Sequence, residues 1–294
     1  MWLDDYELAP APRRVSPLVS AHVLFGGALQ QCGWGVLAFG LALAGVFLAL
    51  ADVEGALRFA GGAIQTQGVV TAVEETHVEV NEQEVWEVAF RFPLEGRTID
   101  GRCYTTDPAD VGRQVTVEYV PGQPELCRIL GTTRRPLPGW VALFVLAFPA
   151  VGLLLVGIGL RKGARGLALL RRGRLALGDL VRTEATNVEI NRRPVMALTF
   201  AFEAGVDGRR YEVTTRTHEP EALQDEARER ILYDPLRPER AVVLDDLPGS
   251  GRVTEAGEVT HFDARGLRRL ILPGLAAAAA ALAAFLTLGN PFGY

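Results

Sequence analysis

Residues 138–160 have the sequence PGWVALFVLAFPAVGLLLVGIGL, and the basic run RKGARGLALLRRGR (161–174) follows without a break. The first stretch contains no Asp, Glu, Lys or Arg. A helix rises about 1.5 Å per residue, so this stretch is long enough to cross the hydrocarbon core of a bilayer. Trp140 lies at one end, where membrane proteins carry their aromatic belt. The sequence predicts a transmembrane helix at 138–160, followed by a basic juxtamembrane segment at 161–177.

Two further uncharged, apolar stretches predict two more transmembrane helices. The first follows an N-terminal tail at 1–17 and opens with Ser16 and Pro17, an N-cap residue and a proline suited to the first helical turn. We expect one helix at 18–51 with its membrane-buried part at 33–50, because the first half contains His22 and two glutamines. The third helix is expected at 270–288.

The third helix is rich in alanine, which favours close packing on a neighbouring helix. The small-residue pairs Gly40/Ala44 and Ala276/Ala280 have the spacing for such a contact. An alternative interpretation stays open, because pairs of this kind are common in any alanine-rich helix.

Basic residues beside the spans predict the orientation of the chain. Close to the span ends, nine of them flank the loop between the second and third spans, whereas four (Arg58, Arg128, Arg134 and Arg135) flank the loop between the first and second. Lys and Arg are enriched on the cytoplasmic side, so we expect the second loop in the cytoplasm and the first outside. The N-terminus, with Arg13 and Arg14, is then cytoplasmic, and 290–294 lie outside. The expected location is the inner (cytoplasmic) membrane, crossed several times.

The basic segment has two interpretations. Its charges alternate with leucines, which suits an amphipathic segment on anionic lipid, where each basic residue contributes about 1 kcal/mol. The simpler interpretation is a topology signal. The candidate lipid-contact residues are Arg161, Lys162, Arg165, Arg171, Arg172 and Arg174. Because the basic residues cluster beside membrane segments, a nucleic-acid partner is not expected; the expected partners are the lipid bilayer and an unidentified membrane or envelope protein.

The two loops between the spans resemble each other. Residues 76–81 (THVEVN) match 186–191 (TNVEIN), and Val85, Phe90 and Phe92 match Val195, Phe200 and Phe202 in the same register. Gly68 matches Gly178 at the same offset, and the tripeptide Asp100-Gly101-Arg102 matches Asp207-Gly208-Arg209. Near the end, residues 119–121 (YVP) match 233–235 (YDP). Matches in one order predict an internal repeat.

Each copy alternates apolar and polar residues in short runs, which is typical of β-strands. In the first copy we expect strands at 69–80, 86–92, 99–105, 115–120 and 127–130. Five short antiparallel strands predict an OB-like or SH3-like small barrel, or a sandwich, at 62–132 and again at 178–248. The second copy adds 219–230, which favours helix. The predicted fold is an α+β membrane protein with three transmembrane helices and two small antiparallel β domains.

The same residues resemble a bacterial membrane family called domain of unknown function 3592. The resemblance rests on the opening Gly68-Val69-Val70, the central aromatic strand, Gly112 before the fourth strand, and the closing Tyr-Asp-Pro-x-x-Pro at 233–238. It covers both loops, roughly half the chain. The first copy departs from it, with Tyr-Val-Pro-Gly at 119–122. The resemblance implies a small β domain held between transmembrane helices and implies no activity, so no catalytic or binding residue is carried over.

No catalytic, metal-binding or cofactor-binding residue is predicted. The four histidines lack metal-ligand spacing, and CxxC, HExxH, Gly-x-Ser-x-Gly and phosphate-loop patterns do not occur in the sequence. Adjacent carboxylates such as Asp245 and Asp246 are expected to be solvated. The predicted spans contain no ionisable Asp, Glu, Lys or Arg, which argues against a transporter or channel.

The cysteines are distributed unevenly. Cys103 and Cys127 both lie in the loop expected outside, whereas the second copy has none at the matching strands. This pattern suits an oxidising compartment and a Cys103–Cys127 disulfide between the third and fifth strands. The alternative is a pair of buried free thiols, which pack as small apolar groups.

Three functions remain in view. The leading prediction is a non-enzymatic protein of the bacterial cell envelope, with the β domains as interaction or scaffolding modules whose sheet edges accept a partner strand. The second is a transmembrane sensor, in which the outer domain binds a ligand and the basic segment couples it to the inner one. An enzyme is the third and would require perturbed carboxylates or histidines in one cleft.

Overall fold

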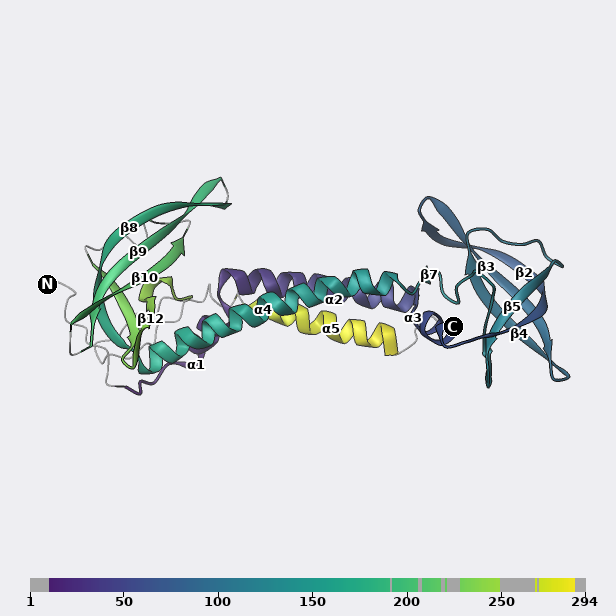
Figure 1. Ribbon diagram of the computed structural model, residues 1–294, viewed down its shortest axis with the longest axis horizontal. Helices are drawn as coiled ribbons and strands as arrows, with labels where there is room; N and C mark the ends of the chain where they lie inside the picture. Colours follow the sequence, from purple (N-terminus) through teal and green to yellow (C-terminus); the bar gives the residue numbers. More distant parts are fainter. Residues whose placement is uncertain are drawn as a thin grey trace. The chain divides into compact units, whose positions relative to one another are not determined.

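The computed structural model describes residues 11–190, 192–205, 208–217, 220, 228–248, 268 and 270–288, within which the protein has an α+β fold (Figure 1). The chain falls into two compact units. One unit contains 1–35 and 153–274, and the other contains 36–152 and 275–294. In the described residues each unit holds one five-stranded antiparallel sheet.

Three helices of the described chain are long and apolar enough to cross a membrane: α2 (Ala28–Leu50), α4 (Val141–Arg172) and α5 (Ile271–Leu288). A multi-pass arrangement was expected from the sequence, and these helices agree with it. The single helix expected at 18–51 is wrong, because the chain forms a short α1 (Pro17–Phe25) and breaks before α2. Two consecutive glycines, Gly26 and Gly27, account for the break, since glycine is a poor helix former.

Helix α4 does not end where its apolar sequence ends. It continues through the basic run to Arg172, and strand β8 begins at Arg174, so the segment expected at 161–177 is part helix and part strand. Ala, Leu, Arg and Lys are good helix formers, which explains the continuation. The helix buries Leu167 and Leu170 in a core with α1, strand β11 (Glu229–Asp234) and the short 3-10 helix η2 (Leu244–Asp246), while its basic side chains are exposed.

Glycines seven residues apart allow α2 and α4 to approach closely. In one unit, a Cβ added to Gly40 would lie 2.7 Å from the backbone nitrogen of Pro149, and one added to Gly152 would lie 2.6 Å from that of Leu37. In the other unit, Gly33 meets α4 at Val156 and Gly159 meets α2 at Gln30. A larger residue at these positions would force the helices apart.

Helix α5 packs on α2 at a position different from the one expected. A Cβ added to Gly45 would lie 2.7 Å from the Cα of Ala283. Gly40 faces α4 instead. The expected contact of the pair Gly40/Ala44 with Ala276/Ala280 is therefore wrong for Gly40. Ala276 itself is buried.

An arginine distant in sequence caps the C-terminus of each of the two longest helices. The guanidinium of Arg135 donates to the carbonyl of Ala49 at 2.7 Å, at the end of α2. The guanidinium of Arg13 donates to the carbonyl of Leu170 at 2.8 Å and also to that of Gly173, at the end of α4. The last carbonyls of a helix lack intrahelical partners and carry partial negative charge, so both contacts stabilise the helix ends.

The two sheets have the same strand order. The first runs β4-β3-β2-β5-β6 and the second β10-β9-β8-β11-β12. The strands of the first are β2 (Ile64–Val80), β3 (Gln83–Leu94), β4 (Arg97–Thr105), β5 (Gln114–Val120) and β6 (Gln123–Ile129). Those of the second are β8 (Arg174–Ile190), β9 (Arg193–Ala204), β10 (Arg209–Thr217), β11 (Glu229–Asp234) and β12 (Arg237–Val243).

Each sheet curves around an aromatic core. In the first, Phe90, Phe92 and Tyr119 are buried, with Phe92 and Tyr119 stacked at 5.7 Å between ring centroids. In the second, Phe200, Phe202 and Tyr233 hold the equivalent places, with Phe202 and Tyr233 5.6 Å apart. The strand facing these rings requires glycine, because a Cβ at Gly68 would lie 2.7 Å from Val117 and one at Gly178 would overlap Ile231.

The long hairpins β2–β3 and β8–β9 match in detail. Register shifts occur at Val70/Ala72 and Glu75/Glu79 in the first, and at Leu180/Arg182 and Ala185/Glu189 in the second, always 110 positions later. Thr76 donates to the carbonyl of Val85, as Thr186 does to that of Val195.

One sequence match between the domains is wrong. Ile99 pairs with Phe92 and Tyr211 pairs with Phe202, so Ile99 and Tyr211 are equivalent. Asp100 therefore corresponds to Glu212, and Arg209 of the tripeptide at 207–209 is instead the first residue of β10, before which the second domain has two additional residues. The helix expected at 219–230 is wrong at its end, because Glu229 and Arg230 begin strand β11. Most of the rest of that segment, Asp207 and the C-terminal residues 290–294 lie outside the described residues.

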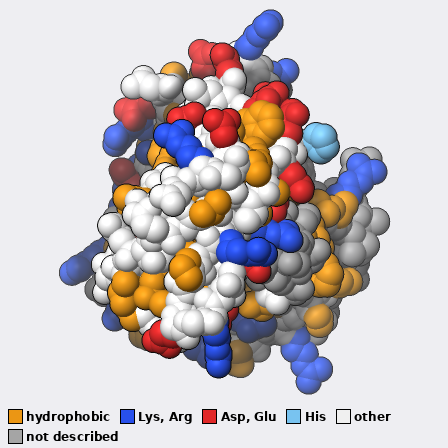
Figure 2. All heavy atoms as spheres, turned by 90° about the vertical axis from the view of Figure 1, so that its right-hand side faces the viewer, with side chains coloured by type: hydrophobic (Ala, Val, Ile, Leu, Met, Phe, Trp, Pro, Cys, Tyr) orange, Lys and Arg blue, Asp and Glu red, His pale blue; other side chains and the backbone are white. Residues whose placement is uncertain are grey.

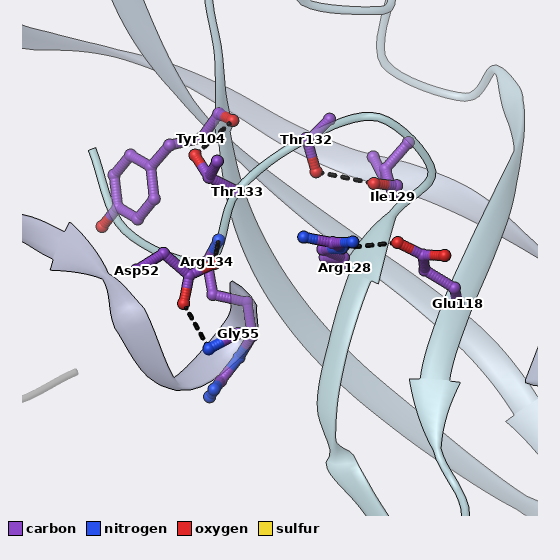
Figure 3. Close-up of polar contacts among 9 residues, drawn as sticks. All are labelled: Asp52, Gly55, Tyr104, Glu118, Arg128, Ile129, Thr132, Thr133 and Arg134. Carbon is purple, nitrogen blue, oxygen red and sulfur yellow. Dashed lines mark hydrogen bonds and ion pairs between the residues drawn. The ribbon is translucent and has the colours of Figure 1, made fainter. Parts of the chain in front are cut away.

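The first sheet is joined to α2 through a compact polar junction (Figure 3). Asp52, which is 3% exposed, accepts hydrogen bonds from the backbone N–H of Gly55 at 2.9 Å and of Arg134 at 2.7 Å. It thereby caps α3 (Val53–Ala60), a helix that the sequence did not predict. It also lies in β1 (Ala51–Asp52), which pairs with β7 (Leu137–Pro138).

The end of β6 closes this sheet on itself. The backbones of Tyr104 and Thr133 exchange hydrogen bonds of 2.7 and 3.1 Å, which joins β4 to the segment after β6 (Figure 3). The sheet is therefore nearly a barrel, in agreement with the small antiparallel domain that was expected.

Candidate functional site

A cleft of about 1120 Å³ lies within the unit formed by 1–35 and 153–274. One wall is the helix break at Gly26 and Gly27 with the first turn of α2. The opposite wall is β10, β12 and η2 of the second sheet. Helix α4 forms the floor through Gly159, Gly163 and Gly166, where the missing side chains leave room for α1 and α2.

Side chains of both charge signs line the cleft in equal number. The four cationic residues are Lys162, Arg165, Arg216 and Arg240, and the four anionic residues are Asp234, Glu239, Asp245 and Asp246. The ammonium of Lys162 lies 4.0 Å from the carboxylate of Asp246. Lys162 is 80% exposed, so this ion pair contributes little to stability and can be rearranged by a ligand.

Two polar groups in the cleft are poorly solvated. Gln30 is 1% exposed, and among the described residues its side-chain Nε2 has no hydrogen-bond partner. The Asp246 side chain is 23% exposed, and burial raises the pKa of its carboxyl group above the ordinary value, against the effect of Lys162. The expectation that Asp245 and Asp246 are fully solvated is therefore wrong for Asp246, because the fold covers η2 with α4.

The basic residues singled out in the sequence separate into two groups. All six are exposed, but only Lys162 and Arg165 line the cleft. The leucines that suggested an amphipathic lipid-binding segment have a different role, because Leu167 and Leu170 pack in the protein core with Val19, Val23 and Leu232. The residues that sequence reasoning missed, Gln30 and the η2 carboxylates, lie far from Lys162 in sequence and carried no motif.

The two cysteines of the first sheet share one core. Cys103 is 0% and Cys127 2% exposed, and in the structure both are free thiols. Burial raises the pKa of Cys127 to about 11, and it raises that of Cys103 as well. The disulfide between them stays a prediction. Among the described residues no group of His, Cys, Asp or Glu is arranged to hold a metal ion.

Each long hairpin has an edge without a neighbouring strand in the described chain. Strand β5 pairs with β2 only at 64–69, and β11 pairs with β8 only at 174–178. Residues 71–80 and 179–190, called the open edges below, are therefore paired on one side alone; Figure 1 shows β8 and β9 extending together as a ribbon. Unpaired N–H and C=O groups of this kind are the template for adding a strand.

The two hairpins differ in charge. The first exposes Glu74, Glu75, Glu79, Glu82 and Glu84. Figure 2, in which the first sheet faces the viewer, shows acidic side chains with a few basic ones in the upper part of the view, and hydrophobic ones scattered among other groups. The second hairpin instead exposes both charge signs, with Arg182, Arg192 and Arg193 beside Asp179, Glu184 and Glu189. The two open edges therefore suit different partners.

No family model, no curated protein and no solved structure matches the chain. The resemblance to the family of unknown function described above accordingly stays a prediction.

Proposed function

We propose that this protein is a non-enzymatic, multi-pass protein of the bacterial inner membrane, in which two β domains serve as interaction or scaffolding modules. The observation that supports the proposal best is the pair of open edges. Both sheets have filled aromatic cores, so the backbone edges and the surface, and not a pocket inside the sheet, are what they offer to a partner. The first domain lies outside the membrane and the second in the cytoplasm.

The two domains are proposed to be copies of one ancestral module. Their common strand order and the register shifts 110 positions apart support this origin. Their partners differ, because the hairpin of the first domain is acidic and that of the second carries both charge signs. The partner of the first domain is expected to present basic side chains beside its docking strand.

The proposal is tested by site-specific photo-crosslinking in native membranes. A photoreactive residue replaces either Glu75, on the open edge, or Arg91, on β3, which pairs with β2 on one side and with β4 on the other. Both positions are exposed. We expect one defined protein to crosslink through position 75 and not through position 91. The same products at both positions, or none at either, would contradict the role of the edge.

A sensor is the second candidate, and the junction at Asp52 favours it. Arg135, in the segment after β6, donates to the carbonyl of Ala49 at the end of α2. A displacement of the first domain would therefore move the end of α2. The shallow cleft of about 440 Å³ beside Leu48, Glu54 and Arg135 would then hold the ligand. A sensor predicts that Arg135→Gln changes hydrogen exchange in both domains, whereas a scaffold predicts a change in the first domain alone.

A further inference from the structure

The position of the charged cleft along α4 indicates the environment of its ligand. The cleft begins at Gly159, the penultimate residue of the uncharged part of α4, and extends past Lys162 and Arg165. If the uncharged part crosses the hydrocarbon core, the cleft lies at the level of the lipid headgroups. Leu29, on the wall of the cleft, is 46% exposed and provides an apolar exit toward the membrane.

The charges of the cleft indicate what the ligand carries. Four cationic and four anionic side chains face the same space, so a simple anion would be attracted by one set and repelled by the other. A zwitterion satisfies both sets. The buried side-chain amide of Gln30 adds a hydrogen-bond donor, and leaving such a donor unpaired costs free energy unless the ligand supplies an acceptor oxygen.

We propose that this cleft binds the headgroup of a zwitterionic phospholipid with a primary ammonium, of the phosphatidylethanolamine class. The phosphate lies at Lys162 and Arg165 and accepts from Gln30, and the ammonium lies at Asp245 and Asp246. Binding replaces the exposed Lys162–Asp246 ion pair with two ligand-mediated ones. The acyl chains leave over Leu29 into the bilayer.

The test uses the full chain, purified in mild detergent and exposed to equal amounts of phosphatidylethanolamine, phosphatidylcholine and phosphatidylglycerol. Bound lipid is counted by native mass spectrometry. We expect phosphatidylethanolamine to be retained at least about tenfold over the other two, because a quaternary ammonium cannot donate hydrogen bonds and glycerol carries no charge. Equal retention of the three lipids would overturn the proposal.

Variants with matched charge changes separate this site from general attraction to lipid. Lys162→Gln/Arg165→Gln is expected to reduce phosphatidylethanolamine binding about tenfold, while Arg171→Gln/Arg172→Gln, on the same helix outside the cleft, leaves it unchanged. Asp246→Asn, which keeps the shape of the side chain, is expected to shift the preference toward phosphatidylglycerol, a readout that misfolding would not produce. An equal loss in both double variants would overturn the site.

A soluble ligand with the same chemistry is distinguished by a separate arm. Inorganic phosphate and phosphoethanolamine are added as competitors at millimolar concentration. We expect neither to displace the lipid, because neither has acyl chains. Displacement by phosphoethanolamine would assign the cleft to a soluble metabolite and overturn the lipid assignment. The inference rests on the proposed membrane insertion, which a separate measurement tests. A protein that stays monomeric in buffer without detergent would contradict insertion itself, whereas equal lipid retention would contradict only the cleft assignment.

Discussion

Cys127 shows how a single buried side chain ties the stability of the first domain to pH. Burial raises its pKa to about 11 from an ordinary value near 9, so the folded state favours the protonated thiol. The stabilisation from the protonated thiol is therefore complete below about pH 9 and is lost as the pH rises through about 11. The loss amounts to about 2 kcal/mol, since one pKa unit corresponds to about 1.4 kcal/mol and partial solvation reduces the total.

The measurement is denaturant unfolding of the purified protein between pH 8 and pH 11. Cys127→Ala lowers stability at every pH but is expected to flatten the fall above pH 9, because the titrating thiol is gone. Cys103 has a raised pKa too, so a smaller fall remains in this variant. An unchanged pH dependence in Cys127→Ala would show that the thiol is already oxidised, as the disulfide prediction requires, or that it is solvated.

The close contact of α2 with α4 gives a prediction at the level of the element. Gly40→Ala would place a Cβ 2.7 Å from the backbone of Pro149, and overpacking of this kind costs about 1–3 kcal/mol. Gly35→Ala is the matched control, because a Cβ at Gly35 meets nothing within 4 Å and alanine favours helix by up to about 1 kcal/mol. Thermal unfolding in detergent, followed by tryptophan fluorescence, is expected to give a lower midpoint for the first variant only. Equal midpoints would mean that the helices separate in solution.

The elements that the sequence predicted well are those set by local pattern. Uncharged length predicted α4 and α5, and alternation predicted both long hairpins. The break at Gly26 was missed because the apolar pattern continues through it, and α3 was missed because its capping residue, Asp52, follows a long apolar stretch. The continuation of α4 to Arg172 depends on packing of Leu167 and Leu170 against β11 and η2, which no local pattern encodes.

At the scale of the whole molecule, the prediction to test is the separation of the two domains by the membrane. Cys32→Ser leaves the two buried thiols as the remaining cysteines, so one added cysteine reports its own side. An impermeant maleimide on intact cells is expected to label Glu82→Cys, at the first hairpin, and not Arg192→Cys, at the second. After permeabilisation both are expected to react. Labelling of Arg192→Cys alone would reverse the orientation, and labelling of both in intact cells would contradict three spans.

The candidate cleft is a property of the whole unit, which explains why the sequence indicated only part of it. Lys162 and Arg165 were visible as a basic run beside a span. Gln30 precedes them by more than a hundred residues and Asp246 follows them by more than eighty, and only the fold brings these side chains to one space. Their chemistry, an amide and a carboxylate, is too common in surfaces to be recognised without that placement.

The two arginine caps also have a consequence in time. A ribosome that has just made Ala49 must add 86 more residues before Arg135 exists, and at about 5–20 residues per second this takes about 4–17 s. Arg13, by contrast, has already been synthesised when Leu170 is added to the chain. The end of α2 therefore lacks its arginine cap while the first domain is still being synthesised. The cap of α4 can form as soon as that helix is complete. Assembly of this chain is ordered by the direction of translation.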